Sequence, residues 1–418
     1  MIIKDWKRFF FSMHYFLKLI FIAKNYDVVF VSSETFNRGK GGENLFFKPM
    51  IEFCKKNNIK YIIFEDSYFK SFGKFDKNDD AIPLDLVSVI QIIFRKFYNL
   101  FYKKPITIDQ IYFRELKISK AVKRLFFKKF HSKAYITLIW NNVTLWRCID
   151  NSACIVDYQH GIICNGHEGY IKENKAPAVK SANNIITLVY GDWFKHTLIE
   201  NDKLGFYSEE NVVTVGFGKK NFNASKGISV KNKKILFSLQ LTPDFENEVN
   251  EKYVEIVKEM IEVNADFLVK NNYEIIFKHH QRYSIYHCPD IKIEHDFISF
   301  DNITPMSDLL NKVNIHMTFH STAAFDAARM GIPTIFIDMH KHLSPNEIFL
   351  KQYDYPCKDL VVKDYKDLKY LLINLDNNSL YKNSCNHVHR WSKDFYHDFD
   401  ELAFSDFLLD KIHTNKNN

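Results

Sequence analysis

The segment NIHMTFHSTAAFDAARMGIPTIFID, from Asn314 to Asp338, has the clearest alternation of strand and helix in the chain. Its apolar opening, NIHMTFH, predicts a strand that ends at His320. Ser321 and Thr322 follow where a helix is expected to begin, and their hydroxyls can cap it. Gly331 suits the left-handed residue that ends a helix, and IPTIFID then predicts a second strand. The segment therefore predicts a strand–helix–strand unit of an α/β sheet.

The start of this predicted helix has the features of a phosphate site. Its first backbone N–H groups lack helical partners and carry partial positive charge, which favours an anion. Asp326 lies one turn further on, where its carboxylate could reach a ribose hydroxyl. Strand, cap, helix, glycine and strand also follow one another in purely structural segments, so the pattern leaves both interpretations open.

The same alternation is present near the amino terminus. YDVVFVSS (Tyr26–Ser33) and KYIIFED (Lys60–Asp66) predict two strands, joined by a glycine-bearing loop and a helix. The loop glycines, Gly39 and Gly41 among them, do not form the GxGxxG dinucleotide fingerprint. The loop is either a flexible turn or a ligand-facing segment at the carboxyl end of the first strand. Further on, residues from about 84 to 135 have a strongly helical pattern.

A Lys-rich, Gly-bearing stretch at 219–234 is the best linker candidate, and the segments around it resemble GT-B glycosyltransferases. VYGDWFKHTLIEN and YSEENVVTVGFG are similar to the end of their amino-terminal domain, and KKILFSLQL to the first strand of their carboxyl-terminal domain. The opening segment is similar to their pattern of paired Ser or Thr, an acidic residue and Gly-x-Pro. The QHG and HST triplets resemble bacterial surface-polysaccharide transferases, including capsule and teichoic-acid-type enzymes. The resemblance covers roughly residues 175 to 375.

This resemblance implies an α/β protein of the GT-B class, with two Rossmann-like domains, a cleft between them and a C-terminal helical tail. The expected parts are an acceptor domain at 1–222 with a helical insertion at about 84–135, a nucleotide-sugar domain at 231–395, and a tail at 396–418. Asp398, Phe399 and Asp400 match the DxD metal motif of the other large transferase fold by letters alone. They lie in the predicted tail and are interpreted as surface charge, so a metal-independent reaction without a bound cofactor is expected.

The cluster KHHQR, from Lys278 to Arg282, follows a predicted strand of the second domain. Lys, His and Arg together can neutralise a nucleotide diphosphate without metal, although a solvated strand end is the alternative. Many surface-polysaccharide transferases carry Lys-x-His-Pro here, and this chain lacks the Pro, so the choice between His279 and His280 stays open. The resemblance implies a nucleotide and phosphate site made of Lys278, His279, His280, Arg282, His320, Ser321, Thr322 and Asp326.

A second cluster lies in VDYQHGIICNGHEGY, from Val156 to Tyr170. Four residues in or next to it could bind zinc by type: Cys154, His160, Cys164 and His167. Their spacing matches no zinc module, so no metal site is predicted. The alternatives are a loop at the carboxyl end of a strand, where α/β folds place function, and a plain glycine turn.

In the functional interpretation, this loop supplies a general base that deprotonates an acceptor hydroxyl. His160 is favoured because the ordinary pKa of histidine is near 6.5. Asp157 and Glu168 are rivals, since either carboxylate could be the base, orient the imidazole, or act as the nucleophile in a retaining reaction. The residues expected to face the acceptor are Gln159, Gly161, Gly39 and Gly41.

Composition limits the compartment and the partners. The net charge of +7 is spread along the chain and matches no nucleic-acid module, so nucleic acid is not an expected partner. Seven scattered cysteines without a CxxC pair favour a reducing compartment, hence the cytoplasm. The amino-terminal segment lacks the cleavage site of a signal peptide, and its apolar run from Phe9 to Ala23 is short for a membrane span. It is interpreted as a helix that is either buried or lies on the anionic inner surface of the membrane.

The sequence thus predicts a glycosyltransferase that moves a sugar from a nucleotide-sugar donor to a bacterial capsule or lipopolysaccharide, with an oligosaccharide or lipid-linked acceptor. The nearest alternative is a CDP-alditol transferase that transfers glycerol or ribitol phosphate. A sugar-nucleotide epimerase would share the architecture, as would a non-catalytic polysaccharide-binding protein. Donor sugar, acceptor, stereochemistry and oligomeric state stay open.

Overall fold

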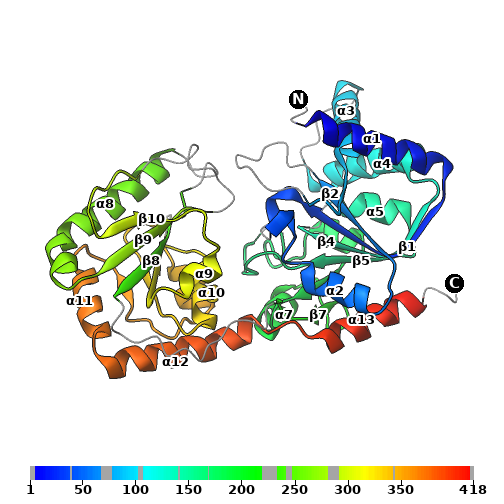
Figure 1. Ribbon diagram of the computed structural model, residues 1–418. Coiled ribbons are helices and arrows are strands. Elements are labelled where there is room, and N and C mark those ends of the chain that lie inside the picture. Colours follow the sequence, from blue (N-terminus) through cyan, green and yellow to red (C-terminus); the bar gives the residue numbers. More distant parts are fainter. Residues whose placement is uncertain are drawn as a thin grey trace. The chain divides into compact units, whose positions relative to one another are not determined.

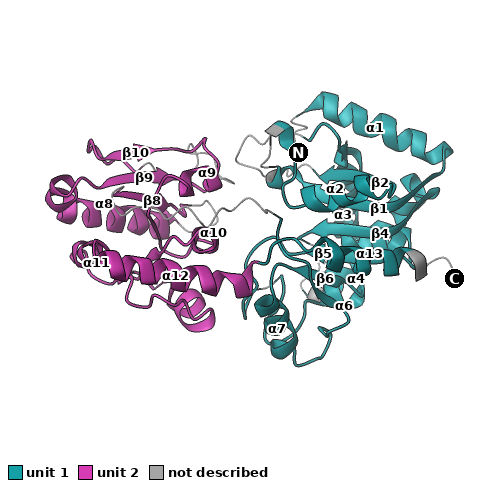
Figure 2. Ribbon diagram, turned by 60° about the horizontal axis from the view of Figure 1, so that its bottom comes forward, with its two compact units in different colours: residues 1–70, 75–218, 397–418 teal, residues 71–74, 219–396 magenta. Residues whose placement is uncertain are grey.

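The computed structural model describes residues 5–37, 40–66, 78–101, 107–139, 142–167, 169–218, 233–241, 247–280, 291–341 and 344–414. The described residues up to Gly218 and those from His397 onward form one compact unit, called unit 1 (Figure 2). The described residues from 233 to Tyr396 form the second, called unit 2. Most of the predicted linker at 219–234 lies outside the described residues.

Unit 1 contains a seven-stranded parallel sheet with the order β3-β2-β1-β4-β5-β6-β7 (Figure 1). Buried, β-branched and aromatic runs form its central strands, as expected of a sheet that is covered on both faces. The strands are β1 (Lys24–Ser33), β2 (Tyr61–Asp66), β3 (Ile82–Pro83), β4 (Phe130–Leu138), β5 (Cys154–Tyr158), β6 (Ile186–Val189) and β7 (Val212–Thr214).

Helices cover both faces of this sheet (Figure 1). The α-helices are α1 (Trp6–Phe21), α2 (Lys48–Lys56), α3 (Asp85–Phe101), α4 (Ile108–Phe126), α5 (Val143–Ile149), α6 (Ala178–Ala182), α7 (Asp192–Asn201) and α13 (Glu401–Thr414). Two short 3-10 turns, η1 (Glu34–Phe36) and η2 (Lys40–Gly42), follow β1.

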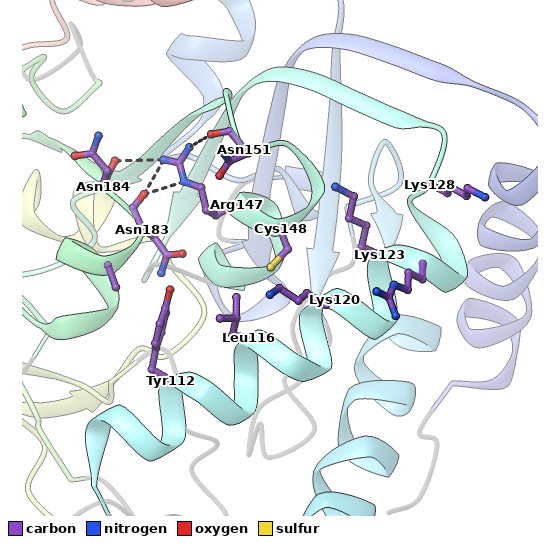
Figure 3. Close-up of a pocket in the computed structure, with 12 residues that line it drawn as sticks. Tyr112, Leu116, Lys120, Lys123, Lys128, Arg147, Cys148, Asn151, Asn183 and Asn184 are labelled. Atoms are coloured by element: carbon purple, nitrogen blue, oxygen red, sulfur yellow. Dashed lines mark hydrogen bonds between the residues drawn. The ribbon is translucent and has the colours of Figure 1, made fainter.

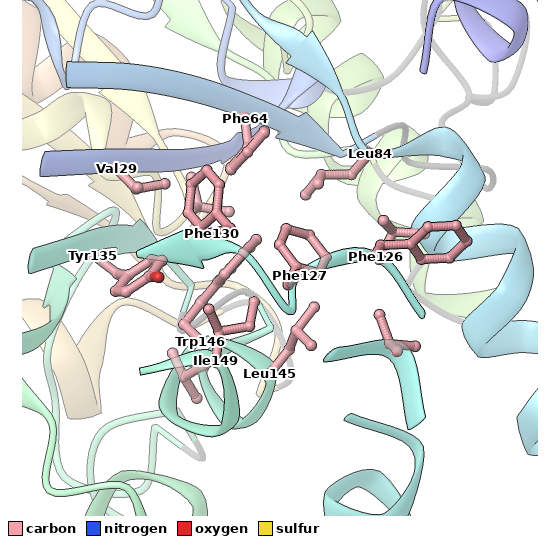
Figure 4. Packing of buried hydrophobic residues seen from close by; sticks show 14 of the residues in the cluster. Val29, Phe64, Leu84, Phe126, Phe127, Phe130, Tyr135, Leu145, Trp146 and Ile149 are labelled. Carbon is pink, nitrogen blue, oxygen red and sulfur yellow. The ribbon is translucent and has the colours of Figure 1, made fainter. Parts of the chain in front are cut away.

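The main core of unit 1 lies between the sheet and helices α1, α3, α4 and α5, around Trp146 (Figure 4). The indole of Trp146 stacks on Phe64 at 5.8 Å between ring centroids and on Tyr135 at 5.3 Å. Phe127 meets the same indole edge-on at 5.9 Å. Aromatic pairs of this kind add to the burial energy, so the many Phe residues of the sequence stabilise this layer.

Unit 2 contains a six-stranded parallel sheet with the order β10-β9-β8-β11-β12-β13. Its strands are β8 (Lys234–Ser238), β9 (Glu274–Lys278), β10 (Ile298–Phe300), β11 (Ile315–Thr318), β12 (Thr334–Ile337) and β13 (Val361–Val362). Its helices are α8 (Asn247–Lys270), α9 (Met306–Leu310), α10 (Ala323–Arg329), α11 (Asp367–Leu375) and α12 (Asn378–Phe395), with a π-helix, η4 (Asn346–Gln352). This strand order is that of the Rossmann fold.

The opening sequence segment folds as predicted, with β11, α10 and β12 in succession. Gly331 has φ +70° and ends α10 in the left-handed region, as its sequence position indicates. The strand ends at Thr318 rather than His320. Helix α10 is nearly all buried, and Phe325 stacks on Trp391 at 5.0 Å with the rings almost parallel.

After α12 the chain returns to unit 1 and adds α13 to it. The amide of His397 donates to Tyr190 O at 2.9 Å, and the amide of Asp400 donates to Val215 O at 2.9 Å. Gly216, with φ +78°, makes this contact possible, because a Cβ there would lie 2.2 Å from Asp398 O. The Asp400 carboxylate accepts from the amides of Leu402 and Ala403 and so caps the start of α13.

Helix α1 has one buried and one exposed apolar face. Phe16 and Leu19 lie in the core, whereas Trp6 and Phe21 are 58% and 75% exposed. The interpretation of this helix as buried therefore describes one of its faces, and its contact with a membrane surface stays a prediction. No helix among the described residues is long and apolar enough to cross a membrane.

Candidate functional site

The loop that begins QHG leaves β5 at the carboxyl edge of the unit 1 sheet. The amide of Gln159 donates to Leu188 O at 2.9 Å, and its side-chain oxygen accepts from the amide of Tyr190 at 2.8 Å. The side-chain nitrogen of Gln159 donates to Gly161 O at 2.7 Å. Gln159 is fully buried, so it fixes the course of the loop rather than facing a ligand.

His160 is half-buried and lies between two aromatic rings. Its Nδ1 is 3.3 Å from the hydroxyl of Tyr170, and the two rings lie nearly parallel at 6.1 Å. Phe36, from η1 after β1, meets the imidazole edge-on at 5.8 Å. The hydroxyl of Tyr207 donates to Tyr170 O at 2.9 Å and holds that residue in place. The imidazole is therefore oriented before any ligand binds.

Asp157 lies within β5 and not in the loop that carries His160. Its side chain has no exposed surface and accepts from Lys180 Nζ at 2.6 Å, and Lys180 is equally buried. Burial lowers the pKa of the Lys180 ammonium, and the charge of Asp157 opposes that shift. The Lys180 ammonium also lies 4.2 Å from the ring centroid of Tyr170. A base must contact its substrate, so this geometry makes Asp157 a structural partner below the loop.

The remaining residues of this loop have separate positions. His167 Nδ1 accepts from the amide of Gly169 at 3.1 Å and packs on Tyr170 at 5.2 Å. Burial raises the pKa of the Cys154 thiol to about 12, which disfavours the thiolate that zinc binds. Among the described residues, His, Cys, Asp and Glu side chains form no group of three or more that could hold a metal ion.

In unit 2, β8 and β11 are neighbours at the point where the strand order reverses, which is where α/β sheets place ligands. The Thr318 hydroxyl donates to Ser238 O at 3.0 Å. The Ser321 hydroxyl accepts from the amide of Ala323 at 3.2 Å, so it caps α10 as predicted. Thr322 is exposed and makes no side-chain cap, and His320 is half-buried.

Lys278 has hydrogen-bond partners within unit 2, and its predicted role in a nucleotide site stays a prediction. Its side chain is buried, and its ammonium donates to Thr304 O at 2.6 Å and to Asp301 O at 3.3 Å. Burial lowers the pKa of this ammonium, against the nearby Asp301 charge. Lys278 thus holds the loop after β10, and its donors are directed to carbonyls of the protein.

The two histidines after Lys278 are half-buried at the carboxyl edge. The amide of His279 donates to Asn302 Oδ1 at 2.8 Å, and its ring lies nearly parallel to Phe300 at 6.1 Å. Asp326 lies on α10 near Tyr396, and burial, followed by the Asp326 charge, raises the pKa of that phenol. Its carboxylate therefore lies near Tyr396, which follows the end of α12, and its contact with a ribose stays a prediction.

Three predicted site residues, Gly39, Glu168 and Arg282, lie outside the described residues. Gly41 lies in η2 with φ +68° and open space around the position of a Cβ. The other predicted residues that follow a strand lie at the carboxyl edge of one of the two sheets. His160 and Gly161 follow β5, His279 and His280 follow β9, and the residues from His320 to Thr322 follow β11.

Sequence reasoning missed the residues that position His160. Lys180 lies in APAVKSANN, which carries no chemical signal, and only the fold places its ammonium beside Asp157. Tyr170 ends the quoted loop segment, but no pattern marked its hydroxyl as a partner of the imidazole. A buried pair joined across 23 positions has no local signature.

Comparisons with known proteins support the fold. The wall teichoic acid polymerase TagF matches with 12% identity over 100% of both chains and a TM-score of 0.55. The glycosyltransferase SnogD from Streptomyces nogalater matches with 9% identity over 92% of this chain and 100% of its own, at 0.54. The UDP-GlcNAc 2-epimerase from Neisseria meningitidis, bound to UDP-GlcNAc, matches with 11% identity over 93% and 100%, at 0.51.

The chain has the GT-B fold. Its two Rossmann-like sheets and C-terminal helices confirm the predicted fold class. Scans against protein-family models and curated proteins gave no match. The fold is shared by glycosyltransferases and UDP-GlcNAc epimerases, and at these identities it does not select between them.

Proposed function

We propose that the protein is a metal-independent glycosyltransferase that uses a nucleotide sugar and acts in bacterial capsule or lipopolysaccharide assembly. The observation that carries the proposal is the position of His160 at the carboxyl edge of β5, oriented by Tyr170 and Phe36. An imidazole held in this way can accept the proton of an acceptor hydroxyl as the glycosidic bond forms. GT-B relatives by fold supply the donor class, since one is a glycosyltransferase and another holds UDP-GlcNAc.

The contact with Tyr170 sets a requirement on the imidazole tautomer. For His160 to act as a base through Nε2, Nδ1 must carry the proton. Nδ1–H then donates a hydrogen bond to the Tyr170 hydroxyl, 3.3 Å away. Tyr170 then orients the ring and stabilises the imidazolium that forms. The buried Lys180 and Asp157 pair below keeps Tyr170 in place, which makes the pair a positioning device.

Unit 2 is proposed to bind the nucleotide at its carboxyl edge, between the ends of β8 and β11. The side chains that lie at this edge are the exposed Thr322, the half-buried His320, and the half-buried His279 and His280 after β9. Gln240, just after β8, has a buried side-chain oxygen that accepts no hydrogen bond from a described residue. A ligand with donors, such as a base edge or ribose, would satisfy it.

The surface of unit 1 favours transfer to a lipid-linked acceptor over epimerisation. Trp6, Phe10, Leu17 and Phe21 recur along one face of α1 and are all exposed. Lys7 and Lys18 flank this stripe, as in helices that lie on anionic membranes. A soluble epimerase would gain nothing from it. Trp6 fluorescence should shift to the blue with phosphatidylglycerol vesicles, and a Phe10→Ser/Phe21→Ser variant should lose the shift.

A donor screen tests the reaction class. The full chain would be incubated with UDP-, GDP-, CMP- and CDP-linked compounds and a lipid-linked oligosaccharide, and nucleotide release would be measured with and without EDTA. Release that depends on the acceptor and is insensitive to EDTA is expected. Turnover of a CDP-alditol alone would favour the alditol-phosphate alternative, and acceptor-independent interconversion of sugars would favour an epimerase. Binding without turnover would contradict the enzyme proposal.

His160→Ala tests the proposed base. We expect kcat to fall about 10²–10⁴-fold, with nucleotide affinity nearly unchanged, because general-base catalysis contributes in this range. His167→Ala is the matched control, since His167 lies in the same loop and packs on the same Tyr170 ring. Equal losses in the two variants would mean that loop packing, not proton transfer, explains the effect. Tyr170→Phe should shift the pH profile of kcat while leaving unfolding by urea almost unchanged.

A further inference from the structure

A cavity of about 1070 Å³ opens at the amino edge of the unit 1 sheet, at the opposite end of β5 from His160 (Figure 3). Its lining comes from helices α4, α5 and α6 and from the connections that lead from them into β4, β5 and β6. Because these strands are parallel, the three connections meet at one edge. The cavity is therefore separate from the site proposed for transfer.

The lining of this cavity is strongly basic. It includes Lys120, Lys123, Arg124, Lys128 and Arg147, and no acidic residue is among the described residues that line it. No described residue forms an ion pair with Lys120, Lys123, Arg124 or Lys128. Like charges three and four positions apart on a helix repel each other and destabilise it. An anion bound among these side chains would relieve the repulsion.

Arg147 adds a positive charge to this lining, and backbone carbonyls hold its guanidinium in place. Its guanidinium donates to Asn183 O at 2.6 and 3.0 Å, to Ala153 O at 2.8 Å and to Asn151 O at 2.9 Å. These partners are neutral carbonyls, so they hold the group without cancelling its charge. Figure 3 shows Lys120 and Lys123 on α4, across from Arg147 and Cys148.

The other lining residues indicate which chemical groups the ligand carries besides its anionic group. Asn151, Asn183 and Asn184 present amide groups, and Tyr112 and Leu116 form an apolar wall along α4. The buried Oδ1 of Asn183 accepts no hydrogen bond from a described residue, and a ligand hydroxyl is the kind of donor it lacks. The volume lies just above the usual range for small-molecule sites, so the cavity has room for a small ligand.

We propose that this cavity binds a phosphate ester of a hydroxyl-bearing molecule. The phosphate contacts Lys120, Lys123 and Arg124, with Arg147 behind them, and the hydroxyls face the asparagines. Two sources share this chemistry: a soluble sugar or polyol phosphate, and the glycerophosphate headgroup of a membrane lipid. The site is independent of the transfer reaction, so its test does not depend on finding the donor.

The test compares two triple variants of the full chain that lose the same charge. Lys120→Gln/Lys123→Gln/Arg124→Gln removes the cluster, and Lys270→Gln/Lys382→Gln/Arg390→Gln removes three exposed cations of unit 2. Binding of glycerol 3-phosphate would be measured by calorimetry, and binding to phosphatidylglycerol or phosphatidylcholine vesicles by sedimentation. We expect the cluster variant to bind at least tenfold more weakly in one arm and the control variant to bind like the native chain.

Cys148 gives a second readout at the same place. Burial raises the pKa of its thiol, whereas Lys120 and Lys123 lower it. A bound phosphate would cover the thiol and offset those charges, so alkylation of Cys148, followed by peptide mass spectrometry, should slow several-fold.

The two arms separate the sources. Saturable binding of glycerol 3-phosphate assigns the soluble ligand. Because the exposed stripe of α1 is itself proposed to bind anionic vesicles, the vesicle arm is measured in the Phe10→Ser/Phe21→Ser background, where vesicle binding that the cluster variant loses assigns the headgroup. No binding in either arm would overturn the proposal, and so would an equal loss in the two triple variants. Unchanged Cys148 alkylation at saturating ligand would place the ligand elsewhere and overturn it as well. Removing like charges should not destabilise α4, and urea unfolding of both variants checks that they fold.

Discussion

Each unit of this protein buries a lysine ammonium near the carboxyl edge of its sheet. The two lysines have different partners. Lys180 in unit 1 pairs with the Asp157 carboxylate at 2.6 Å. Lys278 in unit 2 donates to the carbonyls of Thr304 and Asp301. Burial lowers the pKa of both ammonium groups. The first lysine is part of an ion pair, whereas the second closes a loop.

The difference shows that a residue's neighbours, and not its motif, decide its role. Lys278 lies in KHHQR, which resembles a nucleotide-binding segment, yet its ammonium is directed to the protein's own loop. Lys180 lies in a stretch without any motif, yet it supports the ring that orients His160. The buried lysine of unit 1 thus has a charged partner, and the buried lysine of unit 2 has neutral partners. The following predictions test that contrast.

The largest effect is expected for Lys180→Met, which leaves the Asp157 carboxylate buried without its cation. The free energy of unfolding should fall by about 3–5 kcal/mol, the usual cost of breaking a buried pair from one side. Hydrogen exchange across β4 to β6, with urea unfolding of the full chain, would measure it.

Two further variants interpret that result. Lys180→Met/Asp157→Leu should regain most of the loss, because it removes both charges. Lys195→Met should cost less than about 1 kcal/mol, since its partner Glu209 is largely exposed. If Lys180→Met costs no more than Lys195→Met, the paired-charge account of unit 1 is wrong.

A smaller effect is expected for Lys278→Met. Its partners are carbonyls, so the substitution removes hydrogen bonds without leaving an unpaired charge. The loss should be about 1.5–3 kcal/mol, as for hydrogen bonds to a charged group. Exchange should increase at the amides from 301 to 304. A variant of native stability that loses nucleotide affinity would instead restore the ligand role that the sequence indicates.

The smallest effect concerns His316, a neutral group buried below the edge of unit 2. Its ring nitrogens lie 2.9 Å from Ser238 Oγ and 3.0 Å from Thr334 Oγ1, and burial lowers its pKa to about 3. Between the unfolded pKa near 6.5 and this value, only the unfolded chain takes up the proton. Stability is therefore complete above pH 6.5 and falls by about 1.4 kcal/mol per pH unit below it.

This dependence can be measured by urea unfolding at pH 7.5 and 5.5. The native chain should lose about 1.4 kcal/mol more than His316→Gln over that interval. His387→Gln, at an exposed position of α12, is the control and should behave like the native chain. A pH dependence that His316→Gln leaves unchanged would show that another group carries it.

The sequence predicted the α/β alternation, the segment from β11 to β12 and the fold class, because these depend on local periodicity, caps and glycine positions. It could not predict which strands are neighbours, since the order is set by packing between distant segments. For the same reason the partners of the candidate site were not visible. The ammonium of Lys278 meets carbonyls 23 and 26 positions away, and Arg8 of α1 pairs with Glu65 and Asp85 from other elements.

The return of the chain to unit 1 has a consequence for synthesis in the cell. Unit 1 needs α13 and the contacts from His397 and Asp400, yet these residues leave the ribosome only after all of unit 2. Domains that are continuous in sequence can fold one after another as they emerge, with the amino-terminal one first. Here the amino-terminal unit stays incomplete until unit 2 and α13 have been synthesised, so Phe53 lacks its Phe404 ring contact throughout the synthesis of unit 2.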